Sequence, residues 1–374
     1  METRAALLRE QPGQWQVETV ELDEPHEQEV LLRVVAAGLC HSDEHFAQGE
    51  SPAPKLPMCG GHEGAGVIEA VGPDVARFAP GDHVVTAFMP SCGHCRWCAS
   101  GQQNLCDSGG GIAYGAQMDG TFRMHSGGVD IAQNARLGMF SEYTVVSAVS
   151  CVKIPRRVPL RAAALLGCGV PTGWGSAVRG AGVGPGDTVV VMGVGGIGVN
   201  AVQGAALAGA SHVIAVDPVL FKRETALRLG ATRAFATIAE GADFARSVTG
   251  GQGADAAIVA VGSLEPADFT DAAAAIRKGG TVVVTGLGKR SLNTMVIPFN
   301  EFVLFQKRLQ GALYGMCSPD RDVPRLIALY ESGQLKLDEL ITATYTLDQI
   351  NEGYADLRAG RNIRGLIVHD NDDE

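Results

Sequence analysis

The stretch TVVVMGVGGIG, residues 188–198, joins an uncharged, β-branched run to a glycine-rich turn. The run predicts a buried strand at Thr188–Met192, and the turn is followed by a helical stretch at Val199–Ala208. The glycines of the turn are Gly193, Gly195, Gly196 and Gly198. Glycines permit a tight turn and let backbone N–H groups reach a pyrophosphate at the helix N-terminus. The stretch therefore predicts a dinucleotide site.

An acidic residue follows at the spacing that a dinucleotide site requires. A second strand is predicted at Val213–Val216, and Asp217 comes directly after it. A carboxylate there accepts hydrogen bonds from the adenosine ribose and repels a 2′-phosphate, which favours NAD over NADP. Lys222 is a second candidate for a ribose hydroxyl. In the alternative interpretation, the glycines form a turn of any α/β domain and Asp217 caps a helix.

Strands and helices alternate through the middle of the chain. The next predicted elements are a helix at Lys222–Leu229 and strands at Ala256–Val261 and Thr281–Thr285. Such alternation is typical of a doubly wound parallel sheet. Short strands and turns precede it, and a strand at Ile363–Val368 ends the chain. We therefore predict an α/β protein in which a domain of residues 170–313 is inserted into a β-rich domain of residues 1–169 and 314–374.

Composition excludes several classes of partner. The 374-residue chain carries a net charge of -11 and no block of basic residues, which argues against nucleic acid and anionic membranes. It has no basic start followed by an apolar core, so we expect a soluble, cytoplasmic protein without disulfides. The glycine-rich segment 109–139 is predicted to be a long surface loop, and the acidic residues 370–374 a disordered tail.

Four cysteines crowd into one short segment: Cys92, Cys95, Cys98 and Cys106. Zinc prefers four tetrahedral ligands, and four thiolates close its coordination shell to water. This spacing predicts a structural zinc site. His94 lies inside the segment but is superfluous as a ligand. The alternative, that these are small buried apolar residues, fits poorly because the intervening residues are mostly polar or glycine.

A second set of candidate ligands is scattered along the chain: Cys40, His62 and Cys168. Two thiolates and one imidazole leave a fourth position for water or substrate, which is the pattern of a catalytic zinc. A lone cysteine is usually a core residue, however, and spacing alone does not join these three.

The chain resembles the zinc-containing medium-chain alcohol dehydrogenases over nearly its whole length. The matching stretches are Gly38-Leu-Cys40-His-Ser42-Asp43, Gly61-His62-Glu63-Gly64-Ala-Gly66, the four-cysteine segment, Gly167-Cys168-Gly169-Val-Pro-Thr172-Gly173, and the glycine turn with the strand that ends at Asp217. The resemblance implies a GroES-like β-rich catalytic domain, a Rossmann domain and an active site in the cleft between them. It also implies two zinc ions per chain, with the catalytic one held by Cys40, His62 and Cys168.

The resemblance assigns roles to residues beside these ligands. Ser42 matches the hydroxyl that takes the alcohol proton, and His45 matches the histidine at the solvent end of the relay. Asp43 matches a carboxylate that orients the histidine ligand, and Glu63 matches a conditional zinc ligand. His45 can also be interpreted as an ordinary surface histidine.

The resemblance also assigns cofactor and substrate contacts. His41 stands where many relatives carry an arginine against the pyrophosphate, and a neutral imidazole binds that group less strongly. Arg364 matches the family's other pyrophosphate arginine, and Thr172 matches a residue that packs on the nicotinamide. Phe88 matches a wall of the substrate pocket and is equally interpretable as a core residue.

The resemblance implies oxidation of an alcohol by hydride transfer to NAD, in a homo-oligomer. Segment Ser108–Phe140 and the run Val213–Arg223 look most like a bacterial subgroup of nicotinoprotein alcohol dehydrogenases. In that subgroup NAD stays bound and is regenerated by N,N-dimethyl-4-nitrosoaniline (NDMA) or by the peptide-derived redox cofactor mycofactocin.

Two other functions are compatible with this family resemblance. A thiol-adduct (S-hydroxymethyl) formaldehyde dehydrogenase needs a cationic anchor for carboxylates, for which Arg123 and Arg136 are candidates. A non-catalytic binding protein is the other alternative, and the complete set of Cys40, His62 and Cys168 argues against it.

Overall fold

The computed structural model describes residues 1–53, 55–292 and 294–369. By internal contacts the chain separates into two compact units: unit 1 is Met1–Cys168 with Ser318–Glu374, and unit 2 is Gly169–Cys317. Residues 370–374, predicted to be a disordered tail, lie outside the described residues. Within the described ranges, no helix is both long enough and apolar enough to span a bilayer.

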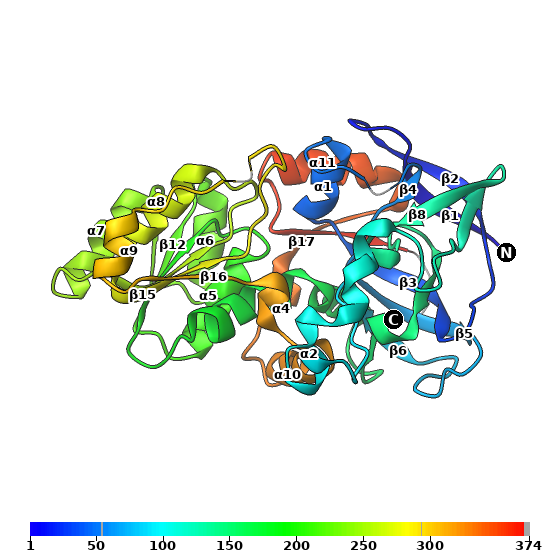
Figure 1. Cartoon of the computed structure of the whole chain (residues 1–374), viewed down its shortest axis with the longest axis horizontal. Helices are drawn as coiled ribbons and strands as arrows, with labels where there is room; N and C mark the ends of the chain where they lie inside the picture. Colours follow the sequence, from blue (N-terminus) through cyan, green and yellow to red (C-terminus); the bar gives the residue numbers. More distant parts are fainter. Residues whose placement is uncertain (54, 293, 370–374) are drawn as a thin grey trace. The chain divides into compact units, whose positions relative to one another are not determined.

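Unit 2 is built on a parallel sheet with the strand order β13-β12-β11-β14-β15-β16. Strands β12, β15 and β16 of this sheet are labelled in Figure 1. Its strands are β11 (Thr188–Met192), β12 (His212–Val216), β13 (Arg233–Phe235), β14 (Ala254–Val259), β15 (Ile276–Val284) and β16 (Arg308–Gly311). Its helices are α4 (Gly169–Gly175), α5 (Gly198–Leu207), α6 (Leu220–Arg228), α7 (Ile238–Val248), α8 (Pro266–Ala275) and α9 (Phe299–Leu304). The predicted alternation of strands and helices is confirmed, and β11 has the bounds that the sequence predicts.

The two faces of this sheet explain why β11 carries no charge. Val189 and Val191 pack against α5 and α6, whereas Val190 and Met192 pack against α7 and α8 on the other face. Successive strand residues point to opposite faces, so a strand covered on both faces needs a continuous apolar run. The strand order also reverses between β11 and β14, which places the turn after β11 at the switch point where such sheets bind ligands.

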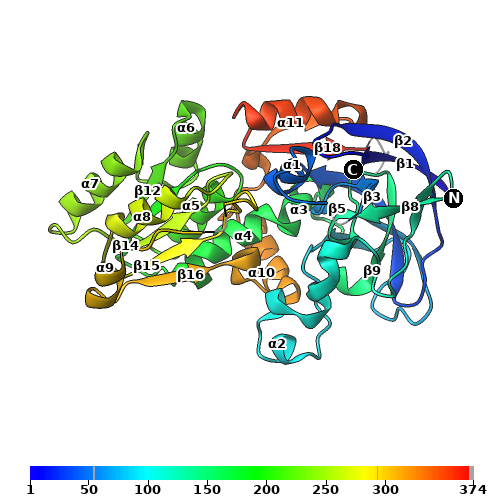
Figure 2. The ribbon, with the colours of Figure 1, turned by 45° about the horizontal axis from the view of Figure 1, so that its top comes forward.

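Unit 1 contains a closed barrel, β1-β2-β7-β8-β4, and a sheet in the order β10-β6-β5-β3-β18-β17, with β9 also paired to β3. β1 and β2 lie side by side in Figure 2. The barrel strands are β1 (Glu2–Leu8), β2 (Trp15–Leu22), β4 (Met58–Cys59), β7 (Met124–Ser126) and β8 (Val129–Gln133). The other strands are β3 (Glu29–Gly38), β5 (Gly64–Val71), β6 (His83–Thr86), β9 (Tyr143–Ser147), β10 (Cys151–Lys153), β17 (Ile341–Tyr345) and β18 (Arg364–Val368).

The last strand returns the end of the chain to the first part of unit 1. β18 pairs antiparallel with β3, with Leu366 opposite Gly38, so Arg364 comes close to the residues that follow β3. The helices of unit 1 are α1 (His41–Ala47), α2 (Arg96–Ala99), α3 (Leu160–Ala164), α10 (Pro319–Glu331) and α11 (Ile350–Arg358). This topology brings segments from both ends of the chain together.

The prediction of a surface loop over residues 109–139 is wrong for its second half. There β7 and β8 form a hairpin that belongs to the barrel, and Met124 and Ile131 are fully buried in the barrel core. The strands are short, and charged or polar residues such as His125 and Asp130 pair with one another across them. The apolar alternation is therefore too brief to stand out in the sequence.

Candidate metal centres and dinucleotide turn

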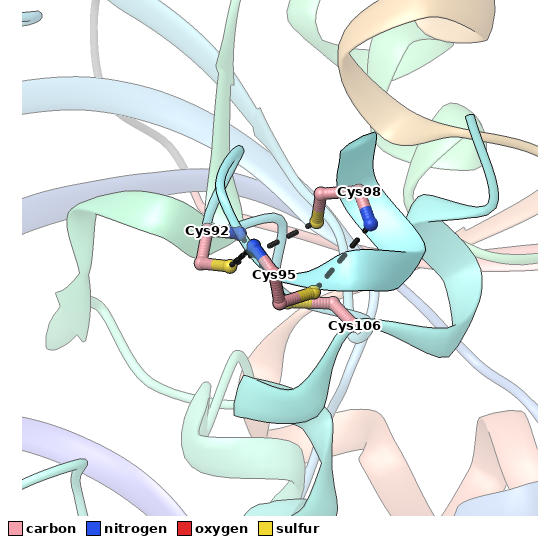
Figure 3. Close-up of side chains that lie close together, drawn as sticks. All are labelled: Cys92, Cys95, Cys98 and Cys106. Atoms are coloured by element: carbon pink, nitrogen blue, oxygen red, sulfur yellow. Dashed lines mark hydrogen bonds between the residues drawn. The ribbon is translucent and has the colours of Figure 1, made fainter. Parts of the chain in front are cut away.

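The four clustered cysteines lie between β6 and β7, and their side chains converge (Figure 3). The Sγ atoms of Cys92 and Cys98 are 3.9 Å apart, as are those of Cys95 and Cys106. Two Zn–S bonds of about 2.3 Å at a tetrahedral angle would separate their sulfurs by about 3.8 Å. The four residues therefore fit a zinc ion. His94 is exposed, and its Nδ1 lies 2.9 Å from the Cys92 carbonyl oxygen.

Backbone amides of the loop point at these sulfurs. The N–H of Cys98 donates to Cys95 Sγ at 3.5 Å, and the N–H of Cys95 donates to Cys92 Sγ at 3.4 Å. The amide of Cys98 is the main cause that lowers the pKa of Cys95 to about 6. Amide donors favour thiolates, which are the form of cysteine that binds metal.

The cysteine loop is attached to the start of α10 by side-chain hydrogen bonds. Ser318 Oγ donates to the Gly101 carbonyl at 2.7 Å. Asp320 accepts from Ser91 Oγ at 2.8 Å and from the Arg77 guanidinium at 3.0 Å. Because α10 comes from the second chain segment of unit 1, the loop connects the two segments of that unit.

The scattered ligand candidates also meet. Cys40 immediately precedes α1, His62 immediately follows the glycines after β4, and Cys168 ends the helical turn after α3. All three are buried, and their ligand atoms lie within 4.8 Å of one another. The fold thus brings together three residues whose proximity the spacing in the sequence does not predict.

The imidazole of His62 is held from behind by a buried carboxylate. Its Nδ1 lies 2.9 Å from Asp43 Oδ2, so Nε2 is the ring nitrogen that remains for a metal. Asp43 Oδ1 in turn accepts from the Gly61 N–H at 2.8 Å and from Asn134 Nδ2 at 2.7 Å. Asn134 was missed by the sequence analysis, because it lies within the segment predicted to be a surface loop. These contacts fix the ring orientation that a metal ligand needs.

Charges inside the cluster favour the thiolate form of Cys40 and attract positive charge. A hydrogen bond with Cys168 and the positive charges of His62 and Arg364 hold the pKa of Cys40 well below its usual value, although burial opposes this. Burial lowers the pKa of His62, but the Asp43 carboxylate and the Cys40 thiolate outweigh it and raise that pKa to about 10. A cation is thus attracted to this cluster, and zinc fits its soft donor set.

Glu63 and Arg364 form a buried ion pair beside the cluster. Gly38 makes room for this pair, because a Cβ there would lie 2.5 Å from Glu63 Oε1 and 2.7 Å from a guanidinium nitrogen. Gly167 also packs closely on Glu63, because a Cβ there would lie 3.1 Å from Glu63 Cβ and 2.6 Å from the Thr86 carbonyl oxygen. Two residues that the sequence assigns to zinc and to pyrophosphate therefore contact each other.

Helix α1 presents three predicted site residues in addition to Asp43. His41 is exposed, Ser42 Oγ lies 3.7 Å from Cys40 Sγ, and His45 is only 5% exposed. His45 is therefore not the surface histidine of the alternative interpretation. Its Nδ1 is 2.7 Å from Glu50 Oε2, a partner that the sequence analysis missed.

Phe88 stands against the metal-site histidine. Its ring centroid is 5.8 Å from that of His62, and the two rings meet edge to face. The side chain is partly buried and packs on the core of unit 1, and its role as a wall of the substrate pocket stays a prediction.

The glycine turn of unit 2 has the geometry that a phosphate approach requires. Gly193 has φ +78°, and a Cβ on Gly198 would lie 1.8 Å from the Gly193 carbonyl oxygen, so both positions demand glycine. A Cβ on Gly195 would meet only Lys222 Nζ, at 4.0 Å, which leaves open space over the turn. Gly198, by contrast, packs tightly against the backbone of Gly193.

Asp217 directly follows β12 and contacts the glycine turn. Its carboxylate accepts from the N–H of Val194 at 3.0 Å and from the N–H of Val219 at 2.9 Å. The residue that precedes α6 is Val219 rather than Asp217. Thr172 on α4 is buried, and its hydroxyl has no hydrogen-bond partner among the described residues. Such a group is available to a ligand.

Comparison with known proteins agrees with this geometry. Residues 26–156 match the alcohol dehydrogenase GroES-like domain, and residues 196–332 match the family described as zinc-binding dehydrogenase. The NDMA-dependent alcohol dehydrogenase of Amycolatopsis methanolica is 52% identical over 372 residues, covering 100% of both chains. The chain belongs to the zinc-containing medium-chain alcohol dehydrogenases.

Solved structures of this family share the fold. A zinc-binding-domain alcohol dehydrogenase from Burkholderia ambifaria has a TM-score of 0.92 and 33% identity, covering 99% of this chain and 100% of that chain. Benzyl alcohol dehydrogenase from Acinetobacter calcoaceticus has a TM-score of 0.90 and 30% identity, covering 98% and 99%. The predicted fold class, GroES-like plus Rossmann, is confirmed for this alcohol dehydrogenase.

The two arginines considered as anchors for a thiol adduct have other partners in this alcohol dehydrogenase. Arg123 is fully buried and forms ion pairs with Glu29 at 2.7 Å and with Asp119 at 2.5 Å. Arg136 is partly buried and donates to the backbone carbonyls of Ala116 at 2.9 Å and Ser108 at 3.0 Å. The prediction that Arg123 anchors the carboxylates of a thiol adduct is therefore wrong, because its guanidinium is buried and paired with Glu29 and Asp119.

Substituting Cys98→Ser is expected to release one zinc ion per chain and to lower the free energy of unfolding by on the order of 3–5 kcal/mol. The reason is that the cysteine loop connects the two segments of unit 1. Denaturant unfolding and metal analysis measure both effects. Cys151→Ser is the control, because Cys151 is buried outside both clusters and its loss should leave the zinc content unchanged. Unaltered stability and zinc content in Cys98→Ser would refute a structural site.

Proposed function

We propose that this alcohol dehydrogenase oxidises an alcohol to an aldehyde or ketone by hydride transfer to NAD, with two zinc ions per chain. The observation that carries the proposal is the buried cluster of Cys40, His62 and Cys168, with Asp43 behind the histidine. Three protein ligands of this kind leave one position for substrate. The cluster of four cysteines is the proposed structural zinc site.

Each residue around the catalytic cluster has a separate proposed role in the reaction. Zinc bound there would supply the Lewis acidity that favours loss of the alcohol proton. Ser42, beside Cys40, is the proposed acceptor of that proton, and His45 the group that passes it to solvent. Asp43 keeps the His62 ring in place, and Glu63 is the proposed conditional ligand.

NAD is the proposed hydride acceptor, bound by the glycine turn of unit 2. The open space over Gly195 suits a pyrophosphate, and Asp217 and Lys222 are the proposed ribose contacts. The buried Thr172 hydroxyl is the proposed nicotinamide contact. Arg364 and His41 are proposed to contact the pyrophosphate, and the Nε of Arg364 is buried without a partner among the described residues.

We further propose that NAD stays bound through turnover and that an external acceptor removes the electrons. Support comes from the NDMA-dependent relative, which is 52% identical over the whole chain. A dye such as NDMA or a small redox cofactor such as mycofactocin fits this role. The cytoplasmic location stays a prediction.

Exposed apolar side chains between residues 287 and 305 of unit 2, here called the apolar surface, support a homo-oligomer. They are Leu287, Leu292, Met295, Val296, Ile297, Phe299, Val303, Leu304 and Phe305. Phe299 is 78% exposed and Leu304 75%, and β16 is an edge strand in the sheet of the described chain. Patches and edges of this kind are normally covered. We propose that a second copy of the chain covers this surface.

Cys168→Ser is expected to lower the rate of alcohol oxidation more than about a hundredfold, because the Lewis acid is lost. The fold should persist, since Cys168 binds metal rather than filling the core. Steady-state rates, zinc content and thermal unfolding are measured together, with Cys151→Ser as the control. Full turnover by a Cys168→Ser protein that has lost its second zinc would contradict the proposed mechanism.

The purified protein is expected to release about one NAD per chain when it is gel-filtered and then denatured. Added alcohol should be oxidised continuously with NDMA and hardly at all with free NAD, because slow release limits exchange. The cofactor is quantified after denaturation, and rates are compared between the acceptors. A filtered protein that carries no nicotinamide and steadily reduces added NAD would show an ordinary exchanging dehydrogenase.

The double variant Phe299→Glu, Leu304→Glu is expected to shift the protein to a monomer. Its carboxylates would be buried without partners in the proposed interface. Light scattering after size exclusion gives the mass. Leu220→Glu is the matched control, because Leu220 lies on α6, is 59% exposed and is outside the apolar surface. If wild type is monomeric, or the double variant keeps its oligomeric mass, this surface is not the interface.

A further inference from the structure

The chain reverses direction after the end of α1 and returns to His45, which lies in the last turn of that helix. The N–H groups of Glu50 and Ser51 both donate to the His45 carbonyl oxygen, at 2.9 and 3.1 Å. This reversal brings the Glu50 side chain alongside the His45 ring, with 2.7 Å between Oε2 and Nδ1. The imidazole is buried, whereas the Glu50 side chain is 26% exposed. The pair therefore lies at the margin between the interior and solvent.

A single glutamine fixes this reversal from the segment after β1. Gln11 Nε2 donates to the carbonyls of Phe46 at 2.6 Å and Ser51 at 3.0 Å, and its Oε1 accepts from the Ala53 N–H at 2.8 Å. An amide side chain offers two donors and an acceptor of this kind, and both of its ends are used on one short loop. Gln11 thereby fixes the backbone on both sides of Glu50.

The carboxylate dictates how the His45 ring carries its proton. An ionised carboxylate only accepts hydrogen bonds, so Nδ1 must be the donor. In the neutral ring the proton is then on Nδ1, and Nε2 has a free lone pair. A carboxylate that selects the tautomer of a histidine base in this way also stabilises the ring after it gains a second proton. His45 is thus held in the form that can take a proton at Nε2.

We propose that Glu50 is a positioning residue that holds His45 as a base at Nε2, and that Gln11 fixes the loop that carries Glu50. The inference rests on the proposed function, in which His45 ends the relay that starts at Ser42. In each turnover Nε2 accepts the alcohol's proton through that relay and passes it to water. The Nδ1 proton stays in the hydrogen bond to Glu50, so His45 returns to the same tautomer.

Glu50→Gln tests the proposal, because the glutamine amide can donate to Nδ1 and so favours the opposite tautomer. The rate of reduction of bound nicotinamide after mixing NAD-loaded protein with alcohol is expected to fall about ten- to a hundredfold. The alcohol concentration for half-maximal rate, the zinc content and the unfolding temperature should change little. Glu50→Asp should recover part of the rate. Glu69→Gln, which removes an exposed carboxylate paired with Arg33, is the charge-matched control.

A double-mutant cycle with His45→Ala separates positioning from general damage. If Glu50 acts through His45, Glu50→Gln causes no further loss in the His45→Ala protein. Gln11→Met, which removes the three hydrogen bonds, should give a smaller loss that also disappears in the His45→Ala protein. Equal losses from Glu50→Gln in both backgrounds, or none in the wild-type background, would overturn the inference. An unaltered rate in His45→Ala alone would instead refute the proposed proton relay.

Discussion

The contact between His62 Nδ1 and Asp43 Oδ2 is the interaction on which the cluster of Cys40, His62 and Cys168 depends. Asp43 is fully buried, and a buried carboxylate is costly unless it is paired and hydrogen-bonded. Its partners come from two separate segments: His62 and Gly61 before β5, and Asn134 after β8. Satisfying this one carboxylate therefore fixes α1, and with it Cys40, relative to the imidazole.

The second buried charge pair, Glu63 with Arg364, imposes a different constraint. A buried ion pair is weak evidence for stability, because desolvation of both charges opposes their attraction. The fold nevertheless makes room for it with Gly38 and Gly167, and it draws one partner from β18 at the end of the chain. Beside a cluster of thiolates, the guanidinium balances negative charge, as its effect on the Cys40 pKa indicates. Such an arrangement is better explained by function than by stability.

What could be predicted from the sequence follows from how local each signal is. The strand Thr188–Met192 and the zinc loop are encoded by consecutive or closely spaced residues, so pattern alone identified them. Cys40 and Cys168 lie close together because segments far apart in the sequence pack against each other. Only the family resemblance predicted that they belong to one site. The β7–β8 hairpin was missed because its strands, Met124–Ser126 and Val129–Gln133, are too short to show a clear alternation. Glu50 was missed because a loop carries no periodicity.

Retention of NAD would depend more on the geometry of unit 2 than on charge from unit 1. Arg364 already has an anionic partner in Glu63, and residue 41 is a histidine rather than an arginine, so neither supplies the unshared cation that clamps a pyrophosphate best. In unit 2, by contrast, the Asp217 carboxylate is oriented by two backbone N–H groups before any ligand arrives. A preorganised site loses less entropy on binding, which lowers the cost of holding a ligand. A long-lived complex then requires no strong ion pair, only a rigid glycine turn and an oriented acid.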